Sequence, residues 1–157
     1  MQKFVIDTSS LIDLEKFYPK DIFPSLWDFL FNMFNQKRLF SVNEVYNELK
    51  DSQDMWKEYK NYFRELTDEE FEYFSEIMIE DKFEPFRRRG FEKTNGDPWA
   101  DPYLVACGIA DKNVTVVSQE SSRKRPHSVI PYVCSEYDVP CIKFLQFLRE
   151  NNFNIWT

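Results

Sequence analysis

The sequence is poor in glycine, histidine and cysteine, and each shortage argues against a class of site. Only three glycines occur, and they fit neither a Gly-x-Gly-x-x-Gly dinucleotide motif nor a phosphate-binding loop ending in Gly-Lys-Ser/Thr. His127 is the only histidine, and its spacing from Cys134 and Cys141 matches neither a zinc site nor a Cys–His nucleophile pair. Dinucleotide-, ATP- and zinc-dependent functions are therefore not expected.

Long apolar runs and paired cysteines are also missing. The longest uncharged apolar run is far shorter than the ~20 residues that a membrane helix needs, so no membrane association is expected. The chain has three cysteines, no Cys-x-x-Cys pair, and no charged-then-apolar leader in its first residues. We therefore expect a reduced, cytoplasmic protein.

Basic residues are outnumbered by acidic ones. Lys and Arg total 20 against 27 Asp and Glu, which gives a net charge of −7 and a pI of about 4.8. This balance excludes a basic surface over the whole molecule, although a local basic patch remains compatible with it. The length of 157 residues fits one domain, and the 16 Phe, 8 Tyr and 4 Trp residues supply a substantial core.

The first part of the chain alternates between strand and helix patterns. Residues 4–6 form a β-prone run that ends at Asp7, and helical spacing of apolar residues follows. Pro24 fits the first position of a second helix. Ser41, followed three residues later by Glu44, matches a capping box that would begin a third helix.

The rest of the chain continues the alternation. Two helices are expected between residues 54 and 81. Residues 65–84 contain nine acids, which we interpret as a solvated face. A helix beginning at Asp97 or Asp101 leads into a buried strand at 114–117. A second strand-helix pair follows, with a strand at 139–142 and a helix at 144–148.

This order predicts a single α/β domain over residues 1–157, with a parallel central sheet and helices on both faces. Residues 51–94 form an acidic helical elaboration of that domain.

Four carboxylates could meet at one edge of such a sheet. Sites in parallel sheets form beyond the carboxyl ends of the strands. Asp7 and Glu120 follow two of the expected strands, Glu48 lies on the third helix, and Asp101 lies at or near the start of the helix before residues 114–117. Clustered acids suit Mg²⁺ or Mn²⁺, which prefer oxygen ligands, and they need such a counter-ion because like charges repel.

At these residues the chain resembles the PIN-domain ribonucleases, in particular the VapC-type toxins of type II toxin–antitoxin pairs. Four segments carry the resemblance in the family's order: Phe4-Val5-Ile6-Asp7-Thr8-Ser9, Val45-Tyr46-Asn47-Glu48-Leu49, Ala100-Asp101-Pro102-Tyr103-Leu104-Val105-Ala106 and Val116-Val117-Ser118-Gln119-Glu120. The family usually carries Asp at the last of these positions, and this chain carries the longer Glu120.

The resemblance implies endoribonuclease activity by two-metal hydrolysis of RNA phosphodiester bonds. It makes Asp7, Glu48, Asp101 and Glu120 the metal-binding, catalytic acids and Thr8 and Ser118 their neighbouring hydroxyls. RNA would be the substrate, and a cognate antitoxin protein and a second copy of the chain in a homodimer are candidate partners.

Simpler roles compete with several of these assignments. Asp7 can cap the turn after its strand, and Asp101 can start its helix, but a capping carboxylate at a helix N-terminus can also bind a metal. We interpret Asp97 as a cap that could also support the site from a second shell, and Glu44 as a structural member of its capping box. The aromatic stripes are assigned to the core.

The two basic clusters are assigned separately. Arg87-Arg88-Arg89 is interpreted as a solvated charge run, as most such runs are. For Arg123, Lys124 and Arg125, solvation and RNA phosphate binding are weighed equally, because the cluster begins three residues beyond Glu120.

Two other functions stay open. One is a PIN-like module that binds RNA or a protein partner without cleaving it. The other, less favoured, is a phosphatase of the haloacid-dehalogenase type. That class needs an Asp two residues after its nucleophile, and here Ser9 occupies the position.

Overall fold

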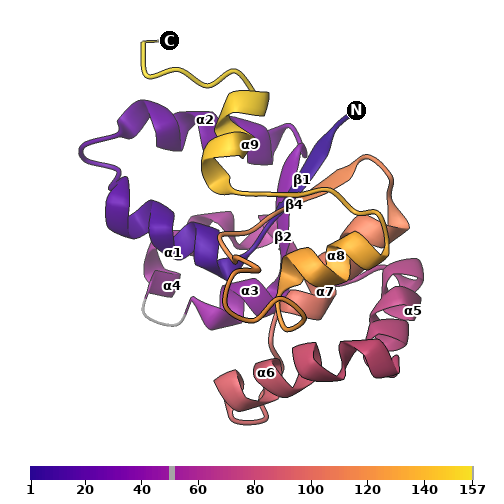
Figure 1. Ribbon diagram of the computed structural model, residues 1–157. Coiled ribbons are helices and arrows are strands. Elements are labelled where there is room, and N and C mark those ends of the chain that lie inside the picture. Colours follow the sequence, from indigo (N-terminus) through magenta and orange to yellow (C-terminus); the bar gives the residue numbers. More distant parts are fainter. Residues whose placement is uncertain (50–51, 157) are drawn as a thin grey trace.

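A five-stranded sheet forms the centre of the computed structural model, which describes residues 1–49 and 52–156 (Figure 1). Every strand pair is parallel, and the strands lie in the order β3-β2-β1-β4-β5. In chain order they are β1 (Lys3–Ile6), β2 (Leu39–Val42), β3 (Phe63–Arg64), β4 (Val114–Val117) and β5 (Cys141–Ile142).

Helices make the connections between these strands. The α-helices are α1 (Thr8–Phe17), α2 (Pro24–Asn35), α3 (Asn43–Glu48), α4 (Gln53–Trp56), α5 (Asp68–Ile77), α6 (Glu84–Thr94), α7 (Asp101–Ala110), α8 (Ile130–Glu136) and α9 (Phe144–Glu150). Two 3₁₀ helices, η2 (Lys57–Tyr62) and η3 (Asp81–Phe83), complete the connections.

Helices cover both faces of the sheet. On one face α7 packs against β1, β2 and β4, with α5 and α8 packed against α7 in turn. The helices α2 and α9 lie on the other face (Figure 1). There α2 contacts β2, and Phe147 of α9 meets Phe4 of β1 edge-to-face, with ring centroids 4.9 Å apart. Strands covered on both faces are shielded from water along their length, and every residue of β4 is buried. The predicted α/β class and its parallel sheet are thus confirmed.

The close packing of α7 against the segment before β5 depends on a glycine. A Cβ on Gly108 would lie 2.4 Å from Cγ1 of Val139, far inside van der Waals contact. The absent side chain lets α7 pack closely against the residues that lead into β5.

The structure corrects the expected elements in the first half of the chain. The sequence patterns did not predict β2 or β3, and the residues expected to form the first helix of 54–81 instead form α4, η2 and β3. Ser41 lies inside β2, where its hydroxyl donates to the carbonyl of Ile6 at 2.6 Å. Asp51, the first residue of the predicted acidic elaboration, lies outside the described residues.

The strand order defines where a site can form. From β1 the chain moves outward to β2 and β3, then crosses back to add β4 and β5 on the other side. The connections therefore leave β1 and β4 on opposite faces, which opens a crevice at the carboxyl ends of these two strands. No helix among the described residues combines the length and apolar character needed to cross a membrane.

Candidate active site

Asp7 sits in the crevice at the carboxyl end of β1 and is 3% exposed. It caps α1, since Oδ1 accepts the backbone N–H of Ser10 at 2.9 Å. Oδ2 accepts the hydroxyls of Ser9 and Ser118, each at 2.7 Å. Burial raises the pKa of Asp7, and the bonds from the two serines oppose that shift. The capping role of Asp7 is confirmed.

Glu48 ends the short helix α3, directly after β2. Its Oε1 accepts the hydroxyl of Thr8 at 2.5 Å, and its Oε2 accepts the backbone N–H of Ala100 at 3.3 Å. These two contacts tie α3 to the start of α1 and to the residue before α7. The half-buried carboxylate is thus held by the two segments that carry Asp7 and Asp101.

Asp101 is the first residue of α7 and is 7% exposed, but no described residue donates a hydrogen bond to its carboxylate. Burial raises its pKa well above the usual value, and the negative charge of Glu120 adds to the shift. Asp7 and Glu48 contribute in the same direction. No described donor offsets the charge of this carboxylate, and the neighbouring acids repel it, so a cation would be a suitable partner at this position.

Glu120 follows β4, and its charge is paired within the protein. Its Oε1 accepts Nη1 of Arg89 at 2.8 Å, and its Oε2 accepts the N–H of Ile130 at the start of α8, also at 2.8 Å. Its own N–H donates to the hydroxyl of Ser118 at 3.1 Å, so this hydroxyl bridges Asp7 and Glu120.

The structure brings the four predicted acids to one edge of the sheet without closing them around an ion. The charges of all three other acids raise the pKa of Asp101. Among the described residues, however, no three His, Cys, Asp or Glu side chains are grouped closely enough to hold a metal ion as they stand. The donor chemistry, carboxylates and hydroxyls, fits Mg²⁺ or Mn²⁺, and closure of the set requires side-chain movement.

Two assigned caps are corrected. The residue before α3 is Val42, no side chain caps that helix, and Ser41 is committed to the sheet. Glu44 instead lines the same cleft as Glu48; burial, then the charges of Glu65 and Glu48, raise its pKa. Asp97 lies four residues before α7 and does not cap it.

A cleft of about 730 Å³ opens beside the acids. Thr8, Glu48 and Asp97 line it, together with Lys93 of α6. The charge of Lys93 lowers the pKa of Asp101, so this lysine is close enough to act on the buried acid. Sequence patterns missed Lys93, because only the fold carries α6 to the cleft.

A basic pocket of about 690 Å³ lies close by. It is lined by Arg89, Ser121, Arg123, Lys124, Arg125, Val129 and Lys143. No described acid forms an ion pair with the cations of the predicted cluster at 123–125 or with Lys143. Because Arg89 both lines this pocket and holds Glu120, the pocket adjoins the acidic edge.

The arginine triplet is not the solvated run that its sequence suggests. Arg87 donates to the carbonyls of Ile77 and Glu80, which fastens α6 to the end of α5. Arg88 pairs with Glu84 one turn away, and both side chains are exposed. Arg89 points to the site. The spacing of 31 residues between Arg89 and Glu120 offers no local sequence signal for the pair.

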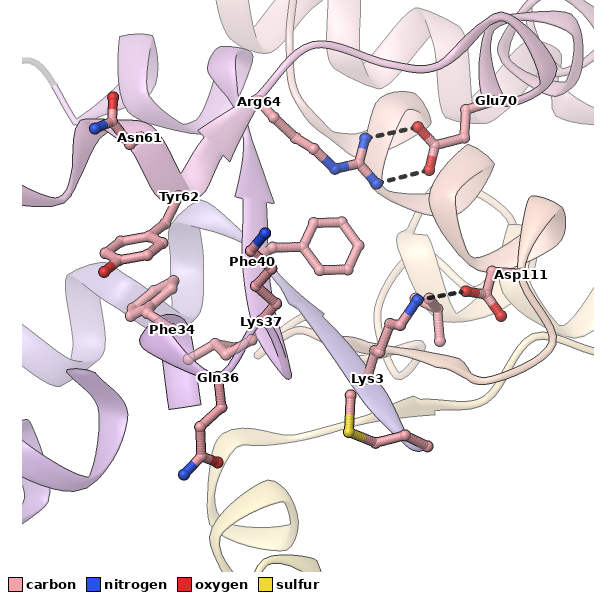
Figure 2. Close-up of a pocket in the computed structure, with 13 residues that line it drawn as sticks. Lys3, Phe34, Gln36, Lys37, Phe40, Asn61, Tyr62, Arg64, Glu70 and Asp111 are labelled. Carbon is pink, nitrogen blue, oxygen red and sulfur yellow. Dashed lines mark hydrogen bonds and ion pairs between the residues drawn. The ribbon is translucent and has the colours of Figure 1, made fainter. Parts of the chain in front are cut away.

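A second cavity, also of about 730 Å³, lies at the opposite end of the sheet (Figure 2). Both acids that line it are paired: Arg64 forms a bidentate pair with Glu70, and Lys3 pairs with Asp111. Phe40 lies between these pairs in the view of Figure 2, and Arg64 stacks over its ring. This cavity contains no unpaired acid, so the candidate active site is the acidic edge at the carboxyl ends of the strands.

The comparisons with known proteins give a family. No curated protein and no solved structure matches the chain. One family model, described as a domain of unknown function (DUF4411), matches residues 4–155. The matched range includes Asp7, Glu48, Asp101 and Glu120. The chain therefore belongs to the DUF4411 family.

Proposed function

We propose that this protein is an endoribonuclease that requires Mg²⁺ or Mn²⁺. The observation that carries the proposal is Asp101 at the crevice between β1 and β4, a residue that is 7% exposed, has no described donor, and has its pKa raised by the charges of three further acids. The adjoining cationic pocket supports a polyanionic substrate. The four segments that resemble the PIN-domain ribonucleases contain the same four acids, which favours RNA.

The acids would hold the metal through the lone pairs that the protein leaves free. Asp101 has its full carboxylate available, and Asp7 and Glu48 each keep part of theirs. A divalent ion bound there would activate water and stabilise the developing charge on the phosphate. The hydroxyls of Thr8 and Ser118 fix the directions of Glu48 and Asp7, and the cations of the basic pocket would hold the neighbouring phosphates of the strand.

Purified protein should cleave single-stranded RNA in Mg²⁺ or Mn²⁺, leave 5′-phosphate ends, and stop in chelator. Activity should return when Mn²⁺ is added in excess, since the acids themselves are unchanged. Gel analysis of a labelled oligoribonucleotide measures all three results. The matched control is an Asp101→Asn preparation, which reports any contaminating ribonuclease.

Equal cleavage in chelator would overturn the metal-dependent proposal. Binding of RNA with no cleavage under any metal condition would instead favour a module that binds RNA without cutting it.

The biological setting that we propose is the toxin of a type II toxin–antitoxin pair. The likeness to VapC-type toxins supports it. Controlled expression should arrest bacterial growth, and expression of a short neighbouring gene should relieve the arrest. Growth unaffected by an active enzyme would contradict the toxin role and leave the nuclease proposal standing.

The basic cluster at 123–125 should bind RNA phosphates. Each phosphate contact on a single strand contributes about 0.7 to the negative slope of log affinity against log salt, so replacing Arg123, Lys124 and Arg125 by Gln should flatten the slope by about 2. Fluorescence anisotropy in chelator at several salt concentrations measures it without cleavage. Arg88→Gln, which removes a surface cation paired with Glu84, is the matched control. An unchanged slope in the triple variant would show that the cluster does not contact RNA.

A further inference from the structure

Arg89 is shared between the acidic edge and the basic pocket. It comes from α6, lines the pocket, and donates from Nη1 to Oε1 of Glu120 at 2.8 Å. A weaker contact of the same nitrogen reaches the carbonyl of Ser128 at 3.4 Å. The arginine is 27% exposed and the glutamate 9%, so the ion pair is largely shielded from water.

The ion pair leaves much of the guanidinium unused. Only Nη1 contacts Glu120, whereas an arginine has five N–H donors arranged to bind a carboxylate or phosphate with two parallel bonds. The other cations of the pocket, at positions 123–125 and 143, have no described acid partner. An RNA phosphate drawn in by those four charges would therefore meet an arginine that can bind it better than it binds Glu120.

Loss of Arg89 would change the state of Glu120. Its second oxygen would still accept the N–H of Ile130, but Oε1 would be free and its charge uncompensated. That charge would add to those of the acids around Asp101, and a cation would be attracted more strongly to the edge.

We propose that Arg89 is a substrate-binding residue that exchanges partners. In the free protein it pairs with Glu120, and in the RNA complex it pairs with a phosphate in the basic pocket, which releases Glu120 to bind metal. The exchange rests on the proposed RNA-cleaving function. Linkage makes it reciprocal: RNA strengthens metal binding, and metal strengthens RNA binding by the same factor.

A double-mutant cycle in chelator tests the exchange without metal or cleavage. Glu120→Gln frees Arg89, so it should tighten the binding of a single-stranded oligoribonucleotide by about fivefold or more, the lower end of usual coupling between sites. Arg89→Gln should weaken binding, and in its background Glu120→Gln should have little further effect. Asp101→Asn removes a negative charge from the same edge but leaves the ion pair intact, and it gives the size of the purely electrostatic effect.

The outcomes separate the exchange from simple charge removal. Tightening that depends on Arg89 and exceeds that of Asp101→Asn supports the exchange. Equal tightening in both backgrounds, or none, overturns it and leaves the nuclease proposal intact. Failure of every variant and of the wild type to bind RNA overturns both. If the cycle holds and no metal condition gives cleavage, the nuclease proposal fails and the exchange describes an RNA-binding site.

Metal binding supplies an independent measurement. Arg89→Gln should bind Mn²⁺ more tightly than the wild type in the absence of RNA, whereas Arg88→Gln should not differ from the wild type. Arg89→Lys keeps the charge without the two-bond geometry, and it replaces Arg89→Gln in the cycle if the latter does not fold. Unchanged Mn²⁺ affinity in Arg89→Gln would show that the ion pair does not restrain the metal site.

Discussion

Asp101→Asn should abolish RNA cleavage and, in chelator, raise the melting temperature. Asn has nearly the same shape, fits the first turn of α7, and removes a buried charge that has no donor. Loss of one electrostatic group at a reacting centre typically lowers kcat by about 100-fold or more. For a domain of this size, each kcal/mol of relieved cost raises Tm by about 2–4 °C.

The stabilisation should depend on pH in a defined direction. The pKa of Asp101 is raised, so its ionisation costs the folded state stability as pH rises from the unfolded pKa, ~3.9, to the folded pKa. The advantage of Asn is therefore complete above the folded pKa and shrinks as pH falls toward the unfolded value. Thermal unfolding of both proteins across this range checks the sign.

Metal should reverse the order of stability. An ion that binds only the folded state stabilises it, so Mn²⁺ should raise the Tm of the wild type but not that of Asp101→Asn. A variant that is less stable than the wild type in chelator at neutral pH would show that Asp101 has a structural partner. Cleavage by Asp101→Asn at the wild-type rate would show that Asp101 is not part of the active site.

Glu48→Gln should also lower cleavage by about 100-fold or more, with little change in stability. The amide oxygen can accept the N–H of Ala100, and the amide nitrogen can donate to the hydroxyl of Thr8, which accepts as well as donates. Both contacts are thus kept while the negative charge is lost. Steady-state cleavage and thermal unfolding of the same preparation separate the two effects.

Glu44→Gln is the matched control, because it removes one charge from the same helix and the same cleft. Glu44 has no capping partner, so its loss should leave the fold intact and relieve repulsion from Glu65 and Glu48. Cleavage should stay within about fivefold of wild type, the scale of a partly exposed charge interaction of up to about 1 kcal/mol. An inactive Glu44→Gln beside an active Glu48→Gln would reverse the assignment of the two glutamates.

The sheet was partly predictable, and the exceptions have a physical cause. The runs at 4–6 and 114–117 consist of apolar or β-branched residues that are all buried, so their composition alone identifies β1 and β4. The strand β2 contains Ser41, which is satisfied by a carbonyl of the neighbouring strand rather than by water. No pattern within 39–42 shows that partner, and the spacing to Glu44 mimics a helix start.

The candidate site was also predictable only in part. Its four acids follow strands or lie on helices that local patterns locate, so their place at one edge was predictable. The true capping box, Thr67 with Glu70, starts α5. Glu70 is buried and pairs with the partly exposed Arg64, whereas most of the other acids of 65–84 are exposed, as the prediction of a solvated face requires. Arg89 and Lys93 lie one turn apart on α6, and their role depends on where tertiary packing places that helix.

The order of the strands also determines when, during synthesis, a ribosome releases a chain able to act. β1 pairs with β4, so Ile6 can pair with Val117, and Asp7 can bond to Ser118, only after more than a hundred further residues have been added. Asp101 and Glu120 are themselves translated late. For an RNA-cleaving protein, this order leaves every nascent chain without a complete centre while it is still attached to its own message. Under the proposed function, the topology would keep a chain from cleaving the message from which it is being translated.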